Sequence, residues 1–208
     1  MRKNVLILLF ALFTLPSFSQ SPKLPGSFLR LSGGSVSFGT GDFMGYSFGV
    51  GLLKNVIKQP RPGLDKLVVG GELIFENGVK NPVIQNPTQE EFFAKTFRHT
   101  SGTLLWAKAG YYPFKKIIKG FNIQAGPVIG YSSRSTEQRA SRVVDIFGNA
   151  VRQSTLTFNN SFVFGYRIST GIEFDLSRRI QAGFRLDFSN NNEAEINTLA
   201  GLSVGIIL

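Results

Sequence analysis

The chain contains no cysteine and only one histidine, His99. Without cysteine it cannot form disulfides, carry a lipid on an N-terminal cysteine or use a thiolate nucleophile. It also lacks His/Cys metal-ligand spacing, a phosphate-binding glycine loop and tandem repeats, so we expect no metal and no cofactor. Beyond its N-terminus it has no apolar run long enough for a transmembrane helix. If it spans a membrane, it must do so as a closed β-barrel, because hydrocarbon cannot satisfy an open sheet edge.

The N-terminus has the pattern of a secretion signal. Two basic residues precede an apolar run over residues 5–15, which is too short to span a bilayer as a helix. Ser17-Phe18-Ser19 then offers a small-x-small cleavage site. We therefore expect residues 1–19 to be a cleaved signal peptide and residues 20–208 to form one domain.

The formal net charge is +10, and it falls to +8 if Arg2 and Lys3 leave with the signal. A basic chain can favour nucleic acid, but an exported one meets anionic lipid instead. We expect outer-membrane lipid and an envelope protein as partners, and no nucleic acid.

Apolar and polar residues alternate with period two through most of the chain. In 158–174, for example, Phe164, Tyr166 and Ile168 alternate with Gly165 and Arg167. A strand with one apolar face can use such a pattern, whereas a helix cannot. Eight segments follow or approach it: 28–38, 43–53, 67–76, 103–112, 121–131, 158–174, 180–188 and 196–208. They predict an all-β fold, an eight-stranded antiparallel up-and-down transmembrane β-barrel.

Two of these segments are less regular. A phase shift at Gly33-Gly34 predicts a β-bulge in 28–38, and the facing of 103–112 stays open. The connections between the eight segments are 39–42, 54–66, 77–100, 113–120, 132–155, 175–179 and 189–195. Because outer-membrane barrels have long outer loops and short periplasmic turns, the two longest connections would face outward.

The polar face decides between two eight-stranded barrels. A soluble lipocalin-like lipid carrier would turn its apolar face inward around a ligand. Here the polar face is rich in glycine, which makes room inside a narrow barrel but weakens a solvated strand. The apolar face carries bulky Phe, Tyr, Ile and Leu, as a lipid belt does. We therefore expect a plugged polar lumen in which buried charges pair. Its charged residues are Glu72, Glu76, Lys108, Arg167, Glu173, Arg185 and Asp187.

The basic residues gather in the connections assigned to the periplasm. These residues are Lys54, Lys58, Arg61, Lys66, Lys115, Lys116, Lys119, Arg178 and Arg179. Only Asp65 and Asp175 oppose them there, whereas the outer loops are neutral in sum. Either these residues bind anionic headgroups or an acidic partner, or they only keep the turns solvated.

One stretch resembles a known family. Gly120-Phe121-Asn122-Ile123-Gln124-Ala125-Gly126-Pro127-Val128-Ile129-Gly130-Tyr131 is similar to a strand of the porin-family, or PorT-like, outer-membrane β-barrel proteins of Bacteroidota. Residues 183–191 and 198–208 resemble that family's last hairpin. The resemblance implies an OmpA/OmpX-like barrel integral to the outer membrane. One departure is the C-terminal Leu208, where such barrels often end in an aromatic residue.

His99 and Ser101 are the weak candidates for catalysis. Their His-x-Ser spacing resembles that of the lipid A deacylase barrels, in which histidine is the base and serine the nucleophile. The residues that follow in that family are missing, and no acid can be assigned to orient His99. We therefore expect a non-enzymatic structural or interaction component of the cell envelope. The hydrolase and the soluble carrier are the alternatives.

Overall fold

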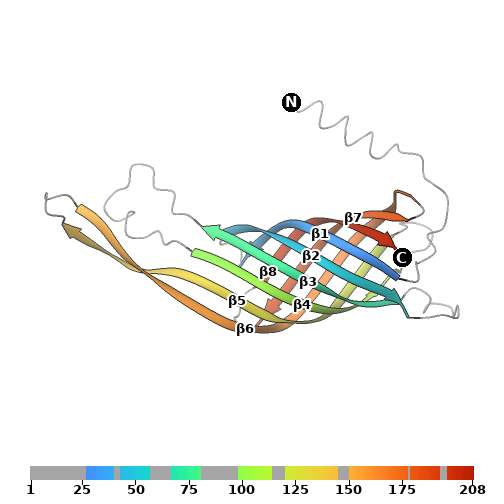
Figure 1. The fold of residues 1–208 in the computed structure, drawn as a ribbon, viewed down its shortest axis with the longest axis horizontal. Coiled ribbons are helices and arrows are strands. Elements are labelled where there is room, and N and C mark those ends of the chain that lie inside the picture. The colour runs from blue at the N-terminus through green and yellow to red at the C-terminus, as the bar shows by residue number, and fades with distance from the viewer. Residues whose placement is uncertain are drawn as a thin grey trace, which may run out of the picture.

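The computed structural model describes residues 27–39, 43–56, 67–80, 98–113, 120–144, 150–177, 179–192 and 196–208. The expected signal peptide lies outside these ranges. The strands are β1 (Ser27–Phe38), β2 (Phe43–Asn55), β3 (Leu67–Lys80), β4 (Arg98–Tyr111), β5 (Phe121–Val144), β6 (Ala150–Asp175), β7 (Ile180–Asn191) and β8 (Ile196–Ile207). Each pairs antiparallel with the next, and β1 pairs with β8, so the sheet closes into a barrel (Figure 1). In the described ranges no helix is long and apolar enough to cross a membrane.

The period-two pattern sets the inside and outside of this barrel. Along β7, Phe184, Leu186 and Phe188 are exposed, whereas Arg185 and Asp187 are buried. The expected fold class, an eight-stranded antiparallel barrel, is confirmed. A lipocalin-like carrier would need an apolar interior, and this barrel instead places its bulky apolar face outside. The alternative of a soluble carrier with an apolar interior therefore does not fit this barrel.

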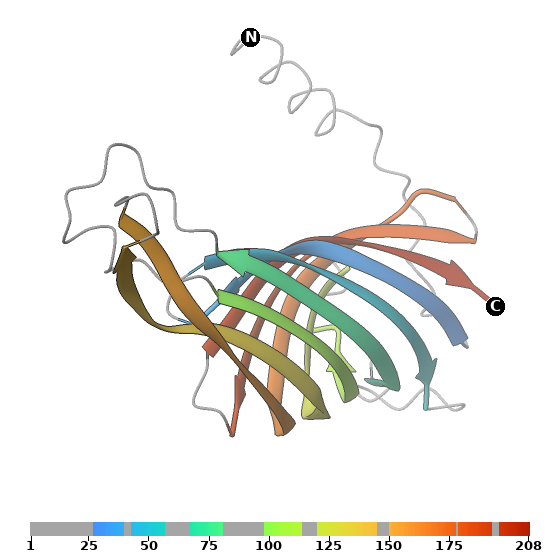
Figure 2. The same cartoon turned by 60° about the vertical axis from the view of Figure 1, so that its left-hand side comes forward.

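The hairpin of β5 and β6 extends far beyond the other strands (Figures 1 and 2). β4 pairs with β5 only as far as Thr136, and β7 pairs with β6 only from Gly165 onward. We call the part beyond, residues 137–144 of β5 and 150–164 of β6, the arm. The prediction of a connection over 132–155 is therefore wrong. Polar residues on both faces hid the strands there, because a two-stranded ribbon outside the barrel needs no apolar face. The predicted connection over 77–100 is too long, because β3 continues to Lys80 and β4 begins at Arg98.

The predicted bulge at Gly33-Gly34 is absent, because β1 pairs with both β2 and β8 without a register shift. Side chains of β1 alternate inward and outward without interruption, but the inward ones change from polar to apolar along the strand. Inward residues of β1 run from Arg30 and Ser32 to Val36 and Phe38. Hydrophobicity therefore switches faces along an unbroken strand.

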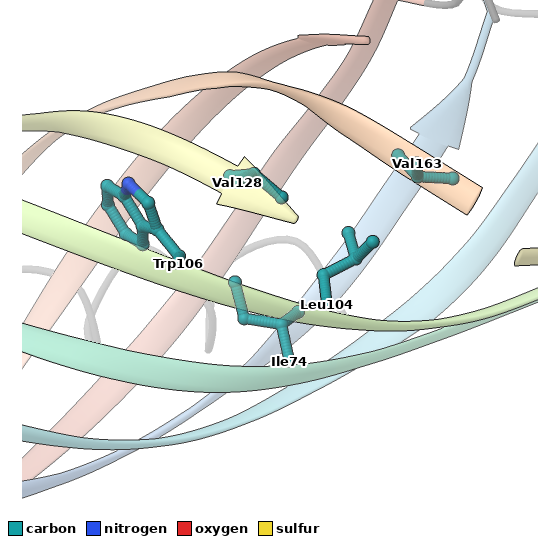
Figure 3. Close-up of a cluster of buried hydrophobic side chains, with 5 residues drawn as sticks. All are labelled: Ile74, Leu104, Trp106, Val128 and Val163. Carbon is teal, nitrogen blue, oxygen red and sulfur yellow. The ribbon is translucent and has the colours of Figure 1, made fainter. Parts of the chain in front are cut away.

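The interior is layered. At the rim where β8 ends, which we call the C-terminal rim, Phe28, Leu53, Val68 and Tyr112 form one buried apolar cluster. Towards the rim from which the arm leaves, the arm rim, a second cluster holds Ile74, Leu104, Trp106, Val128 and Val163 (Figure 3). A third, smaller cluster of Val36, Phe38 and Leu199 lies on the β1–β8 side. Charged side chains lie on the same inward faces, between the residues of these clusters along the strands.

Candidate functional site: an ionic network inside the barrel

Among the described residues, eight charged side chains are buried inside the barrel. They are Arg30, Glu72, Glu76, Lys108, Arg167, Glu173, Arg185 and Asp187. All seven residues assigned to the lumen from the sequence are among them, and Arg30 is the addition. Four are basic and four acidic, so the set is neutral. Buried charges of this kind are tolerated only when they are paired and hydrogen-bonded.

Glu72 on β3 joins three strands. Its carboxylate accepts an ion-pair hydrogen bond from Lys108 Nζ on β4. It accepts another from Arg185 Nη1 on β7 at 2.7 Å, and one from Ser32 Oγ on β1 at 2.6 Å. Gly49 on β2 leaves the space, because a Cβ there would overlap Glu72 Oε1 and Ser32 Oγ. The glycine is thus needed for the volume that it leaves to the carboxylate.

Asp187 on β7 joins two of the buried arginines, Arg167 and Arg185. Arg167 Nε and Nη2 donate to Asp187 Oδ2 at 3.0 and 2.8 Å, and Arg185 donates from Nε to Oδ1 at 3.0 Å. Arg185 Nη2 also pairs with Oδ2. Arg167 then reaches across the barrel to Glu76 on β3, with Nη1 donating to Oε1 at 3.0 Å.

Trp106 lies beside this group and is fully buried. Lys108 Nζ is 4.3 Å from the centroid of its ring, and the guanidinium carbons of Arg167 and Arg185 are 5.7 and 5.6 Å away. Cations at such distances are attracted to the negative face of an indole ring. The structure therefore settles the open facing of 103–112: Leu104, Trp106 and Lys108 point inward.

A second group lies nearer the C-terminal rim. Arg30 on β1 forms an ion pair with Glu173 on β6 and donates to Gln124 Oε1 on β5 at 3.1 Å. Tyr112, just past the end of β4, donates its hydroxyl to Glu173 Oε2 at 2.8 Å. Burial, together with the negative charge of Glu173, raises the pKa of Tyr112 far above its usual range, so the phenol stays protonated. Sequence reasoning missed Arg30 and Tyr112, although strict alternation back from Ser32 along β1 places Arg30 on the inward face.

The two groups cross-link β1, β3, β4, β5, β6 and β7 through the interior. Each of Glu72, Glu76, Glu173 and Asp187 accepts from at least one cation. Carboxylates held in this way are poorly suited to general acid–base work, which needs a proton acceptor with free access to substrate. Among the described residues, no group of three or more His, Asp or Glu side chains could hold a metal ion.

His99 and Ser101 lie on β4, on the face opposite the buried Thr100, and so share the outer wall. His99 Nε2 is 3.2 Å from Asn77 Nδ2 on β3. An amide nitrogen can only donate, so Nε2 accepts, and the lone pair that a general base needs is occupied. Ser101 and Asn77 line a shallow hollow of about 340 Å³ in the wall, together with Tyr46, Phe75 and Tyr131.

Most of the basic residues assigned to the periplasmic connections lie outside the described ranges, namely Lys58, Arg61, Lys66, Lys115, Lys116, Lys119 and Arg178. The two that are described, Lys54 and Arg179, are both exposed. Lys54 pairs with Ser27 at the start of β1, and Arg179 O accepts from Ile207 N at the end of β8. They therefore share the C-terminal rim.

Comparison with solved structures identifies the fold. Neisserial surface protein A superposes with a TM-score of 0.51 at 11% identity, covering 88% of this chain and 97% of that one. The fold is that of a small outer-membrane β-barrel. The attachment invasion locus protein Ail of Yersinia pestis gives a TM-score of 0.43 at 12% identity, covering 86% of this chain and 97% of that one. The N-terminal barrel of Pseudomonas aeruginosa OprF gives 0.42 at 14%, covering 88% and 97%. No family model and no curated protein matches the sequence.

Proposed function

We propose that the chain is a non-enzymatic integral outer-membrane β-barrel. Its lumen is plugged by side chains, and it acts as a structural or interaction component of the cell envelope. The observation that carries this proposal is the inverted polarity of the barrel. Phe184 is 62% exposed on the outer wall, whereas Arg167 is 1% exposed inside. Water would favour the opposite arrangement, whereas hydrocarbon outside favours this one.

The strand lengths agree with a bilayer. A tilted membrane-spanning strand needs about 9–11 residues, and β1, β2, β7 and β8 have 12 or 13. Exposed Tyr46, Phe75, Tyr131 and Tyr166 lie towards the arm rim, and exposed Tyr111 and Phe174 lie towards the C-terminal rim. Aromatic side chains at both ends of an apolar band are typical of barrels in outer membranes.

A plugged lumen follows from strand number and side-chain size. Eight strands enclose an interior that side chains just fill. Here the inward positions carry Trp106, two arginines of the central group, and apolar clusters towards each rim. Transport of ions or solutes along the axis would have to separate these buried ion pairs.

Absence of catalysis is supported by the state of the candidate groups. The interior carboxylates are engaged by cations, and His99 Nε2 is engaged by Asn77. A hydrolase would need the His99 lone pair to face Ser101. Lipid A hydrolysis by the His99→Ala variant and the parent chain, measured side by side, tests this part. Activity that depends on His99 would contradict it.

Two finer parts belong to the same proposal. The PorT-like resemblance of residues 120–131 supports an origin among Bacteroidota envelope barrels. The basic C-terminal rim, which carries Lys54 and Arg179, would face the periplasm and lie on anionic headgroups or an acidic partner. Each such residue contributes about 1 kcal/mol near an anionic surface, and salt screens the attraction.

Fractionation tests the proposal as a whole. We expect the chain to sediment with outer membranes, to need detergent for extraction, and to migrate faster on SDS gels before boiling than after. Recovery from the periplasm without detergent would contradict the membrane location. Steady large-conductance openings in planar bilayers would contradict the plugged lumen while leaving the location intact.

A further inference from the structure

The arm leaves one edge of β6 without a neighbouring strand in the described part of the chain. β7 pairs with β6 only from Gly165 to Asp175. At the point where β7 ends, Asn192 takes the place of the missing strand. Its side-chain amide accepts from Phe164 N at 2.9 Å and donates to Phe162 O at 3.1 Å, and its own N donates to Phe164 O at 2.9 Å. This edge therefore binds a hydrogen-bonding partner where one is within reach.

These contacts fix which backbone groups point to the open edge. In an antiparallel strand, the N–H and C=O of successive residues point alternately to the two sides. The backbone groups of Phe162 and Phe164 point towards Asn192. β6 pairs with β5 in continuous register from Leu156 to Ile172, so this alternation holds along that stretch. The backbone groups of Leu156, Phe158 and Asn160 therefore face the open edge, while Thr157 and Asn159 face β5.

Residues 156–164 carry few of the usual protections of a free edge; the arm's pairing shifts register farther out, between Gln138 and Ser141 of β5. Natural edge strands are blocked by proline, lysine, inward-pointing charges, bulges or short length. Residues 150–164 read AVRQSTLTFNNSFVF, with Arg152 as the sole charge and no proline. Leu156, Phe158 and Phe162 are also exposed on it, and Phe158 is 68% exposed. A long, nearly uncharged edge with apolar side chains favours pairing with another strand.

We propose that this edge of β6 pairs antiparallel with the same edge of a second copy of the chain, about a two-fold axis at Thr157. This register places Leu156 opposite Phe158 of the second copy, and Phe158 opposite its Leu156. Aliphatic and aromatic residues directly opposite one another stabilise antiparallel pairs. Both residues have backbone groups facing the edge, so each such pair is a hydrogen-bonded one.

Side-chain matching selects this register over its neighbours. An axis at Phe158 also aligns the backbone groups, but it sets Leu156 opposite Asn160 of the second copy. An axis at Asn159 sets Phe158 opposite Asn160 of the second copy. With the axis at Thr157, Thr155 lies opposite Asn159 and Gln153 opposite Ser161, so polar positions meet polar ones. The segment is thus complementary to itself in one register.

The pairing produces a four-stranded sheet with a barrel at each end, because antiparallel strands enter it from opposite directions. It rests on the proposed function, since it names the partner of an envelope interaction protein. It adds that the partner is another copy, joined through arms outside the lipid belt.

The absence of cysteine makes the register directly testable in the full chain. Thr157→Cys would lie at the axis, in a non-hydrogen-bonded pair whose Cα atoms are about 4.5 Å apart, a separation that a disulfide tolerates. In detergent micelles under mild oxidation, we expect most of this variant to run as a dimer on non-reducing gels. Asn159→Cys is the matched control on the same face and should stay at least tenfold less cross-linked.

Two further variants complete the test. An equal mixture of Thr155→Cys and Asn159→Cys chains should cross-link to each other, because these positions lie opposite in the proposed register. Asn160→Pro removes an edge-facing N–H while leaving the pairing with β5 intact, and should abolish the Thr157→Cys dimer. Equal cross-linking of Thr157→Cys and Asn159→Cys, or none at either, would overturn the proposal. The heat-dependent gel shift of the same samples reports the barrel, so a lost dimer with a retained shift rejects the pairing alone.

Discussion

Arg167 and Asp187 lie diagonally across the β6–β7 pair, and Arg167 donates two hydrogen bonds to one carboxylate oxygen of Asp187. Arg167 Nη1 donates a third hydrogen bond, to Glu76 Oε1 on β3 across the barrel. One guanidinium thus holds two carboxylates from β3 and β7. The planar fork of arginine makes this possible, because it donates in several fixed directions at once.

Replacing Arg167 with methionine should destabilise the barrel by about 3–5 kcal/mol, because it leaves Glu76 without its ion-pair partner and weakens the hold on Asp187. Urea unfolding in lipid vesicles measures the change. Arg179→Met is the matched control, since Arg179 is exposed at the C-terminal rim and should cost little. Equal stability of the two variants would show that the interior pairs contribute nothing net.

Glycine 49 should not tolerate a larger residue. In Gly49→Val the new side chain meets Glu72, which cannot move aside without losing Lys108 and Arg185. Overpacking of this kind costs about 1–3 kcal/mol. Gly33→Val is the control, because a Cβ at Gly33 meets no atom closer than Ser47 O at 3.6 Å. The two unfolding midpoints should therefore separate clearly, and a stable Gly49→Val would place Glu72 elsewhere.

An arginine introduced on the outer wall of the barrel should destabilise the protein, whereas one introduced on the arm should not. Phe184 lies four residues into β7, well inside the expected lipid belt, and Phe184→Arg should cost about 2–4 kcal/mol. Phe158 is as exposed, but it lies seven residues beyond Gly165, where β6 leaves β7, so Phe158→Arg should fold normally. Insertion into vesicles followed by unfolding compares them. Similar losses at both positions would place the arm in lipid.

The two rims should differ in access from outside the cell. A membrane-impermeant thiol reagent should label Asn159→Cys on intact cells, because the arm would lie outside and a cysteine at this position is not expected to cross-link to itself. Arg179→Cys at the C-terminal rim should react only after the outer membrane is opened. The reverse pattern of labelling would invert the orientation, and with it the assignment of the basic rim to the periplasm.

The alternation of bulky and small residues was enough to predict the strand number, the antiparallel order and the inward face of β7 and β8, because one face of each strand must suit lipid and the other a narrow interior. The same reasoning failed at the arm. Over residues 132–142 of β5 neither face is apolar in the sequence, so the pattern that marks a strand in lipid is lost where the ribbon leaves it. It also gave a false bulge in β1, because Val36 and Phe38 pack inward near the arm rim. Pairings such as Glu72 with Arg185, 113 positions apart, depend on closure and cannot be read from local pattern.

That separation constrains how the barrel assembles. Glu76 on β3 obtains Arg167, and Arg30 on β1 obtains Glu173, only after β6 has arrived. A sheet that stopped at β5 in hydrocarbon would carry Glu76 and Arg30 without these counter-charges, at several kcal/mol each. The growing sheet must therefore keep its concave side wetted, or shielded by an insertion machinery, until the last strands dock. We therefore expect completion of the ionic pairs to favour insertion: a chain that stalls before β6 keeps unpaired ions on its inner face and is poorly suited to the bilayer.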